Sequence, residues 1–399
     1  MNTQFSPRRP TVLIYRDQLL PYSETFISAQ GEAYRTFQSL YVGSSRVPNP
    51  LQTLPQSRCL TFDQCKPMSG VWKGLYKLTG YTNPQWIGKI RARSPQLIHA
   101  HFGLDGVLAM PLASRLKLPL LVTFHGYYAT AQPTFQVEDS SPRFWLDYIN
   151  KRGSFFRQLF FRRQQQLFDS AQCIIAVSEH IKRSLIAKGC PPEKIQVHYI
   201  GIDVKTFQFS PGEARQPCVL FVGRLVEKKG CEGLIRAMAK LQSTRPDVKL
   251  IIVGDGPLRP SLEALAAKTL TNYQFEGSQP SGVVRARMAE AQLLAAPSIT
   301  GPSGETEGLP IVVLEAMAMG LPVVSTVHAG IPEAITHEKT GLLVQEGDVE
   351  ALEKEISRIL QTPSLAKQLS YAGRRQVETV FNLQVNARKL ETLYLETIS

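Results

Sequence analysis

A chain of 399 residues exceeds the size of one ordinary hydrophobic core, so two domains are expected. Hydrophobic residues at 43% and charged residues at 20% are typical of a soluble globular protein, and no run of about 18 apolar residues is present to span a bilayer. Residues 1–200 hold 24 Lys and Arg against 11 Asp and Glu, while the rest is almost neutral, so the first half is expected to face an anionic surface of lipid or nucleic acid.

The cysteines are scattered without the spacing of metal ligands, which favours reduced thiols in a cytosol over disulfides or zinc. The six are Cys59, Cys65, Cys173, Cys190, Cys218 and Cys231. The N-terminus, MNTQFSPRRP, lacks the continuous apolar segment of a secretory signal. A cytoplasmic location is therefore expected.

Strands and helices alternate through the first half. A strand is expected at 11–15, a helix entered through 23–27, a strand at 97–102 followed by a helix to 116, and a strand at 118–124. This alternation predicts parallel β-α-β units, in which ligands collect beyond the carboxyl ends of the strands. His99, His101 and His125 would lie near that edge; we interpret His99 as a packing residue and His125, which precedes a glycine, as functional.

Residues 151–168, KRGSFFRQLFFRRQQQLF, combine basic and aromatic side chains at helical spacing. The apolar residues fall mainly on one stripe, with arginines beside it: Phe155, Leu159, Phe160, Leu167, Arg157, Arg162 and Arg163. Two interpretations stay open, namely a domain helix whose stripe faces the core and an interfacial helix on an anionic membrane. Phe156 and Phe161 lie outside the stripe, which favours the membrane interpretation.

The best domain boundary lies in residues 203–217, which carry Pro211, Gly212 and Pro217 among polar residues. Before it, strands are expected at 173–177 and 195–199, with Ser178 as a helix N-cap. After it, the pattern of strand, loop and helix repeats, with strands at 218–222, 249–253, 273–277 and 293–296. The last segment, 365–399, is helical in pattern. Two doubly wound α/β sheets in tandem are the predicted architecture.

The segment from Pro297 to Gly330 contains two carboxylates, Glu307 and Glu315, with seven residues between them. A Gly- and Ser-rich loop precedes a helix that is expected to begin at Pro310, because the first helical position needs no amide hydrogen bond. A strand, a loop and a helix N-terminus in this order suit an anion such as phosphate. The alternative is that both acids merely flank a helix start, where acids are favoured anyway.

Three loops of the second half converge if its sheet is parallel. They carry Arg224 and Lys229, then Gly254–Pro257, then the Glu307–Glu315 segment. Cations, a glycine turn and a helix N-terminus suit a diphosphate, while carboxylates suit the hydroxyls of a sugar or ribose. No G-x-G-x-x-G opens either half, and no Walker lysine loop is present, so a nucleotide sugar fits better than NAD or ATP.

Three motifs in order, VGRLVEKKG at 222–230, GDGP at 254–257 and ETEGLPIVVLEAMAMGLPVV at 305–324, resemble the retaining glycosyltransferases of family 4. The first half is similar, less tightly, to bacterial exopolysaccharide transferases of the colanic acid type, through residues 23–26, HAHF at 99–102 and His125-Gly126. The resemblance implies a GT-B fold of two Rossmann-like domains across a cleft. Residues 1–205 with about 380–399 would bind the acceptor, and 206–379 the donor.

The resemblance also implies roles for single residues. Arg224 and Lys229 would hold the donor diphosphate, Glu307 the sugar hydroxyls and Glu315 the ribose, while His125 would reach the donor from the other domain. Glu305, two residues before Glu307, competes for its role. The remaining donor-binding positions would be Gly223, Gly254, Gly256, Pro257, Gly308 and Leu309. Retention is explained in this family by front-face attack with the leaving phosphate accepting the acceptor's proton, without a metal or another cofactor.

The leading hypothesis is a cytoplasmic enzyme, peripheral on the inner face of a membrane, that moves a sugar from a UDP- or GDP-sugar to a lipid-linked oligosaccharide or other glycan. A nucleotide-sugar epimerase is one alternative, because it would use the same donor without an acceptor. A non-catalytic nucleotide-sugar binder is the other. Scattered Lys and Arg, without an aromatic-rich sheet motif, argue against nucleic acid as a partner.

Overall fold

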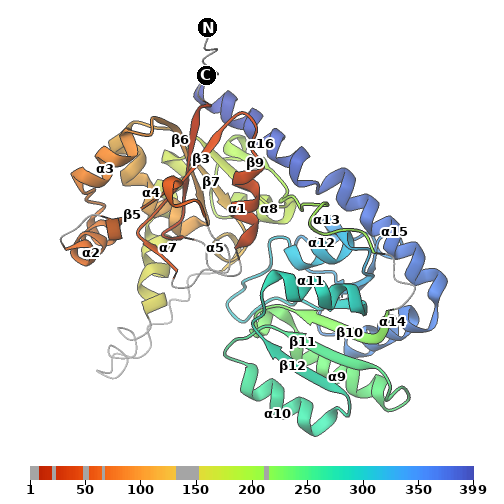
Figure 1. Ribbon diagram of the computed structural model, residues 1–399. Coiled ribbons are helices and arrows are strands. Elements are labelled where there is room, and N and C mark those ends of the chain that lie inside the picture. The colour runs from red at the N-terminus through yellow and green to blue at the C-terminus, as the bar shows by residue number, and fades with distance from the viewer. Residues whose placement is uncertain (1–8, 20–23, 48–53, 65–67, 132–151, 211–214) are drawn as a thin grey trace, which may run out of the picture.

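The computed structural model describes residues 9–19, 24–47, 54–64, 68–131, 152–210 and 215–399. Two parallel sheets lie side by side, each covered by helices on both faces (Figure 1). Ser23 of the predicted helix entry, Cys65, and both Pro211 and Gly212 of the predicted 203–217 boundary lie outside the described residues. The tandem of two doubly wound sheets is as the sequence predicts.

The first sheet has seven parallel strands in the order β5-β3-β1-β6-β7-β8-β9. Their bounds are β1 Thr11–Tyr15, β3 Gln38–Gly43, β5 Cys59–Thr61, β6 Pro95–His101, β7 Leu120–Phe124, β8 Cys173–Ala176 and β9 Ile195–Val197. β2 (Gln18–Leu19) and β4 (Ser45–Arg46) form a small pair beside it. The central strands are buried on both faces, as runs such as Val12–Ile14 require when helices cover a parallel sheet.

The helices of the first domain connect these strands. They are α1 Thr25–Glu32, α2 Ser69–Thr79, α3 Pro84–Arg91, α4 Gly103–Leu116, α5 Tyr127–Thr130, α7 Arg152–Ser170 and α8 Glu179–Ala187. Ser178 caps α8 by accepting a hydrogen bond from Ile181 N at 3.2 Å, as predicted. Phe160 and Leu167 of α7 are fully buried against the core of the first domain. This half of α7 therefore supports the core-facing interpretation; the side chains of Phe155, Phe156, Arg157 and Leu159 lie outside the described part.

The second sheet has six parallel strands in the order β12-β11-β10-β13-β14-β15. Their bounds are β10 Gln216–Val222, β11 Lys249–Val253, β12 Tyr273–Gly277, β13 Ala291–Ala296, β14 Val323–Thr326 and β15 Leu342–Val344. The helices are α9 Cys231–Gln242, α10 Arg259–Thr269, α11 Ser281–Glu290, α12 Ile311–Ala318, α13 Ile331–Ala334, α14 Val349–Gln361 and α15 Pro363–Val380. Because β10 lies in the middle, the loops after β10, β11 and β13 share one edge.

The last helix, α16 (Leu383–Ile398), returns to the first domain (Figure 1). Glu391 accepts hydrogen bonds from the backbone N–H groups of Thr36 and Phe37 at 2.6 and 2.8 Å. Where α16 begins, it runs beside the first crossing between the domains: Ile202 N donates to Phe381 O at 2.7 Å, and Leu383 N donates to Ile202 O at 3.0 Å. The two chain crossings between the domains therefore lie side by side.

The structure corrects the predicted start of the helix that carries Glu315. Pro310 is the N-cap residue, with an extended backbone at φ −66° and ψ 116°, and α12 begins at Ile311. Pro310 adopts an extended ψ and so takes the N-cap position, where its missing N–H costs no intrahelical hydrogen bond, and the helix begins one residue later than predicted. Glu315 then lies just over one turn into the helix.

Candidate active site

The loops after β10 and β11 pack directly on each other. Gly223 N donates to Val253 O at 3.0 Å, and Leu225 N donates to Asp255 O at 2.9 Å. Gly254 has φ +139°, and a Cβ there would lie 1.9 Å from Gly223 O, so only glycine permits this approach. The loop that carries Gly223 and Arg224 and the loop Gly254–Pro257 therefore contact each other, as predicted.

The same edge carries the other predicted residues of these loops. A Cβ on Gly256 would lie 2.5 Å from Leu225 O, so this glycine also allows a close backbone approach. The side chain of Arg224 is exposed to solvent, as is Pro257. The side chain of Arg224 is therefore accessible to a ligand at this edge of the sheet.

A 3-10 turn, η4 (Glu227–Lys229), aims two lysines at the loop that follows β13. The turn ends at Gly230 with φ +65°, where a Cβ would lie 1.8 Å from Pro297 O. The turn is therefore pressed against the start of the Pro297–Gly330 segment. Lys228 Nζ and Lys229 Nζ each lie 3.1 Å from one carboxylate oxygen of Glu307.

Glu307 is a buried carboxylate held in its charged form. Burial alone would raise the pKa of Glu307, but the positive charges of Lys229 and Lys228 outweigh it and set the pKa at about 2. The carboxylate is therefore ionised at any physiological pH. Glu305 turns away instead: its carboxylate accepts from Ser303 N at 3.0 Å and from the Ser303 hydroxyl. The structure thus brings Glu307, and not Glu305, to the lysines.

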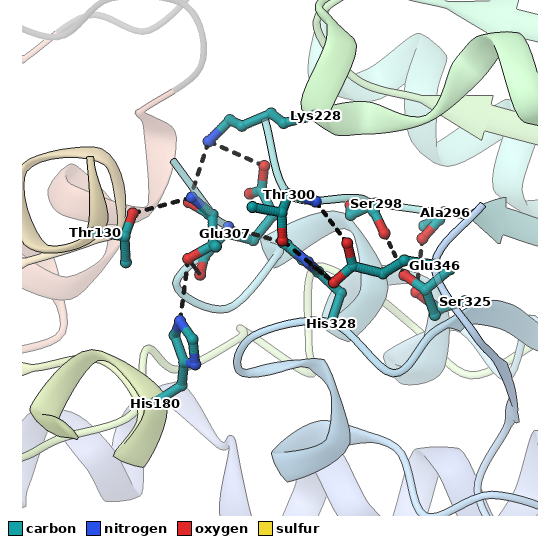
Figure 2. Close-up of polar contacts among 12 residues, drawn as sticks. Thr130, His180, Lys228, Ala296, Ser298, Thr300, Glu307, Ser325, His328 and Glu346 are labelled. Carbon is teal, nitrogen blue, oxygen red and sulfur yellow. Dashed lines mark hydrogen bonds and ion pairs between the residues drawn. The ribbon is translucent and has the colours of Figure 1, made fainter. Parts of the chain in front are cut away.

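A histidine that the sequence did not single out fixes the backbone of Glu307 (Figure 2). His328 Nε2 accepts a hydrogen bond from Glu307 N at 3.1 Å, so this ring nitrogen carries no proton. The proton sits on Nδ1, which donates to Glu346 Oε1 at 2.7 Å. Glu346 Oε2 in turn accepts from Thr300 N at 2.7 Å. This chain of hydrogen bonds fixes the position of the loop that carries Glu307, as second-layer residues commonly do for a binding group.

The first domain holds the other side of the same loop (Figure 2). Thr306 N donates to Thr130 Oγ1 at 2.9 Å, and Thr306 Oγ1 lies 3.1 Å from His180 Nε2. A Cβ on Gly308 would lie 2.1 Å from the backbone oxygen of His125, so the glycine allows the two domains to touch here. Leu309 beside it is buried.

A second contact between the domains uses a carboxylate. Glu333, in α13, accepts hydrogen bonds from Glu179 N at 2.8 Å and His180 N at 3.0 Å, the first N–H groups of α8. Tyr199 donates its hydroxyl to the same carboxylate at 3.0 Å. A negative charge at a helix N-terminus is favourable because it meets unpaired amides and the positive end of the helix dipole. Glu333 therefore joins the two domains beside the candidate site.

Three histidines form a column along the first sheet's carboxyl edge. His99 Nδ1 lies 2.6 Å from the Tyr394 hydroxyl and Nε2 lies 2.6 Å from Thr123 Oγ1, so this residue is satisfied in the core, as predicted. His101 Nδ1 lies 3.1 Å from His125 Nε2. Burial lowers the pKa of both His101 and His125 well below the usual range, so both rings are neutral.

His125 Nδ1 and His101 Nε2 are buried and find no hydrogen-bond partner among the described residues. Buried polar atoms of this kind are costly unless a ligand satisfies them. Beside them, Arg16 pairs with Glu24 at 2.6 Å and with Asp105, and its guanidinium lies 4.4 Å from the centre of the Phe102 ring. Arg16 and Asp105 were not singled out from the sequence.

Glu315 lines a cavity of about 530 Å³ between the domains. Its lining includes Arg285 from α11, Phe26 and Ser28 from α1, and Asp203 from the crossing. Burial raises the pKa of Glu315 to about 7, against the opposing charge of Arg285. Glu307 and Glu315 thus lie in one segment but in different surroundings, one permanently charged and one poised near neutrality.

The chain matches two family models, Glycosyltransferase Family 4 over residues 53–206 and Glycosyl transferases group 1 over residues 203–376. It is 35% identical to the putative colanic acid biosynthesis glycosyltransferase WcaL of Escherichia coli (strain K12), over 74% of this chain and 69% of that protein. It is 34% identical to the amylovoran biosynthesis glycosyltransferase AmsK of Erwinia amylovora, over 73% of this chain and 67% of that protein.

Solved structures share the fold over nearly the whole chain. The Anabaena protein Alr3699/HepE, in complex with UDP and glucose, superimposes with a TM-score of 0.73 at 21% identity, covering 96% of this chain and 99% of that one. WaaG, a glycosyltransferase involved in lipopolysaccharide biosynthesis, superimposes with a TM-score of 0.63 at 18% identity, covering 95% and 99%. The predicted GT-B fold is thus confirmed, and the chain belongs to glycosyltransferase family 4.

Proposed function

We propose that the protein transfers a sugar, with retention, from a UDP- or GDP-sugar to a lipid-linked oligosaccharide or other glycan in cell-surface polysaccharide synthesis. The buried Glu307 carboxylate, held by Lys228 and Lys229 beside the Gly223 and Gly254 loops, is the observation that carries this proposal. The names of WcaL and AmsK support the polysaccharide context, and the complex of HepE supports UDP.

In this proposal residues 206–379 bind the donor, and residues 1–205 with about 380–399 bind the acceptor. Arg224 and Lys229 hold the diphosphate, and the loop residues Gly223, Gly254, Gly256, Pro257, Gly308 and Leu309 shape its seat. Glu307 accepts from hydroxyls of the sugar, and Glu315 from the ribose. His125, with its unpartnered Nδ1, faces the donor from the other domain.

The bond from the anomeric carbon to the diphosphate breaks, and a bond from that carbon to the acceptor oxygen forms. The proton of the acceptor hydroxyl passes to the leaving phosphate oxygen. The charge that develops on the diphosphate is offset by Lys229 and Arg224, which form a preorganised positive environment. Glu307 at a pKa of about 2 stays ionised, so it serves as a hydrogen-bond acceptor and not as a proton donor.

A thermal-shift screen against UDP- and GDP-sugars tests the proposal, because a cognate donor stabilises the folded state according to its affinity. The expected result is a raised melting temperature with one nucleotide class. Chromatography of the reaction with a lipid-linked glycan extract then separates a transferred sugar from an isomerised free one. Isomerisation without acceptor would establish the epimerase instead, and no turnover at all with a bound donor would favour the binder.

Replacing Glu333 by alanine is expected to lower kcat/KM for transfer by about tenfold or more. The change leaves two N–H groups of α8 and the Tyr199 hydroxyl without their shared acceptor, and hydrogen bonds to a charged group contribute about 1.5–3 kcal/mol each. The domains should then spend less time in contact, which small-angle scattering would report as a larger radius of gyration.

Glu333→Gln is the matched variant, since it keeps one oxygen acceptor and should fall between the wild type and Glu333→Ala. Glu338→Ala is the control, because Glu338 lies close to Glu333 in the sequence but forms an exposed ion pair with Arg358. This variant should leave the transfer kinetics and the radius of gyration unchanged. Wild-type kinetics together with an unchanged radius in Glu333→Ala would show that this contact does not hold the domains together.

A further inference from the structure

We propose that α2, with its flanking residues Met68 and Tyr81, is the surface by which this protein docks on an anionic lipid bilayer. The proposal deepens the proposed function, because a lipid-linked acceptor gives such docking a purpose. It also moves the membrane contact away from residues 151–168, where the sequence had suggested it.

The outer face of α2 exposes apolar side chains that the first domain leaves uncovered. Met68 and Leu78 are each 63% exposed, Val71 is 56% exposed and Tyr81 is 48% exposed. Val71, Leu75 and Leu78 are spaced four and three residues apart, so they share one side of the helix. Single exposed apolar residues are ordinary, but a contiguous group marks an interaction surface.

The gathering of these residues is specific to α2. Among the described residues, ten large hydrophobic side chains are exposed, and four of them fall within the 14 residues from Met68 to Tyr81. The other six are spread over the remaining described chain, in α8, α11, α15, α16 and a loop. The inner face of α2 is anchored to the first domain by Tyr76, which is buried and donates its hydroxyl to Leu108 O.

The sequence segment that contains α2 carries a charge that suits an anionic surface. Residues 64–104 contain six basic residues and no Asp or Glu: Lys66, Lys73, Lys77, Lys89, Arg91 and Arg93. A helix that presents Val, Leu and aromatic residues within a purely basic stretch has the composition of an interfacial helix. Trp72 packs partly against the core of the first domain, and the exposed Tyr81 stacks on it with ring centres 5.9 Å apart. An exposed tyrosine of this kind favours the headgroup level of a bilayer.

The position of α2 suits delivery of a lipid-linked acceptor. Lys77 Nζ lies 2.5 Å from Asp17 Oδ2, and Asp17 N donates to Asp105 Oδ1 at 3.2 Å, next to Arg16. The carboxyl end of α2 therefore lies at the same edge of the first sheet as the Arg16, Glu24 and Asp105 cluster. Figure 1 shows α2 at the side of the first domain that lies away from the second sheet.

No helix in the described part of the chain is both long and apolar enough to cross a bilayer. The proposed contact is therefore a shallow one, in which Val71, Leu78 and Met68 enter the acyl boundary. Basic side chains of the segment other than Lys77, which pairs with Asp17, stay at the level of the phosphates. Such binding combines apolar burial with charge attraction, so it should weaken as salt is added.

Cosedimentation of the full chain with vesicles of equal parts phosphatidylglycerol and phosphatidylcholine tests the proposal. Leu78→Glu is expected to lower the partition coefficient, taken from the fraction bound over a series of lipid concentrations, by about tenfold, because burial of one leucine corresponds to roughly a tenfold change in partition. Leu395→Glu is the matched control, since Leu395 is 45% exposed on α16 and receives the same change of charge. Hydrogen exchange with vesicles present should slow at 69–79.

Three results would overturn the proposal: a wild-type protein that ignores these vesicles at low salt, equal binding by Leu78→Glu and Leu395→Glu, or loss of binding only in Arg162→Glu/Arg163→Glu of α7. None of these depends on donor or acceptor, so the proposed function can survive each of them. Conversely, vesicle binding through α2 in a protein that transfers no sugar would leave this surface established and the proposed function contradicted. Detergent-dispersed acceptor should still be used by Leu78→Glu.

Discussion

Replacing Glu307 by alanine is expected to reduce sugar transfer by roughly 10²–10³-fold while binding of free UDP or GDP stays the same or tightens. In the proposed role the carboxylate meets hydroxyls of the donor sugar, so its loss affects the sugar and spares the nucleotide. Its removal also leaves Lys228 and Lys229, each 3.1 Å from the carboxylate, without their shared negative partner. The donor diphosphate would then be the anion that they meet.

Lys229→Ala should behave differently, because it removes a cation from the proposed diphosphate seat. Binding of free UDP or GDP and transfer should fall together, by about tenfold or more, since a hydrogen bond to a charged group contributes about 1.5–3 kcal/mol. Thermal shift with the free nucleotide and steady-state transfer kinetics measure the two effects separately. Lys240→Ala is the control: this lysine lies in α9 and pairs with exposed Glu350, away from the loop.

Full transfer activity in Glu307→Ala or in Lys229→Ala would contradict the assignment of these residues to the donor-binding site. Equal loss of nucleotide binding in both variants would contradict the division of roles between them. Glu307→Gln guards against misfolding, because it keeps the shape of the side chain in a buried position while removing the charge that Lys228 and Lys229 stabilise.

The parts of the candidate site that lie in short motifs directly after a strand could be predicted from the sequence. The glutamate pair, the lysine turn and the glycine loops each follow a strand of a parallel sheet, so their convergence follows from topology. The supporting residues could not be found this way. His328 is 21 residues from Glu307 and Glu346 a further 18 away, and only the packing of β14 and β15 brings them under the loop. Thr130 and His180 come from the other domain.

The first sheet shows a similar limit. β3 was not predicted, because its sequence, QSLYVG, places polar groups at buried positions. The structure satisfies each of them: the Ser39 hydroxyl donates to Gly31 O at 2.6 Å, and the Tyr41 hydroxyl donates to Glu32 Oε1 at 2.9 Å. Both partners belong to α1. A hydrophobic pattern therefore cannot reveal a buried strand whose polar groups are paired by a neighbouring helix.

Glu315 should make donor binding and protein stability respond to pH in opposite directions. Burial raises its pKa from 4.5 to about 7, with Arg285 opposing the shift. Between these values the folded protein holds a proton that the unfolded chain has lost, so raising the pH lowers the free energy of unfolding, by at most about 3 kcal/mol. Above about pH 7 both states are ionised and this contribution becomes constant.

Donor affinity should rise over the same window, because only the carboxylate form accepts strongly from two ribose hydroxyls. Glu315→Gln removes the titration while keeping the shape, so it should flatten both curves and be the more stable protein at pH 8. Urea unfolding and donor titration from pH 5 to pH 8 measure the two responses. If Glu315→Gln kept the wild-type slope of donor affinity against pH, the titrating group would lie elsewhere, and the ribose contact proposed for Glu315 would fail with it.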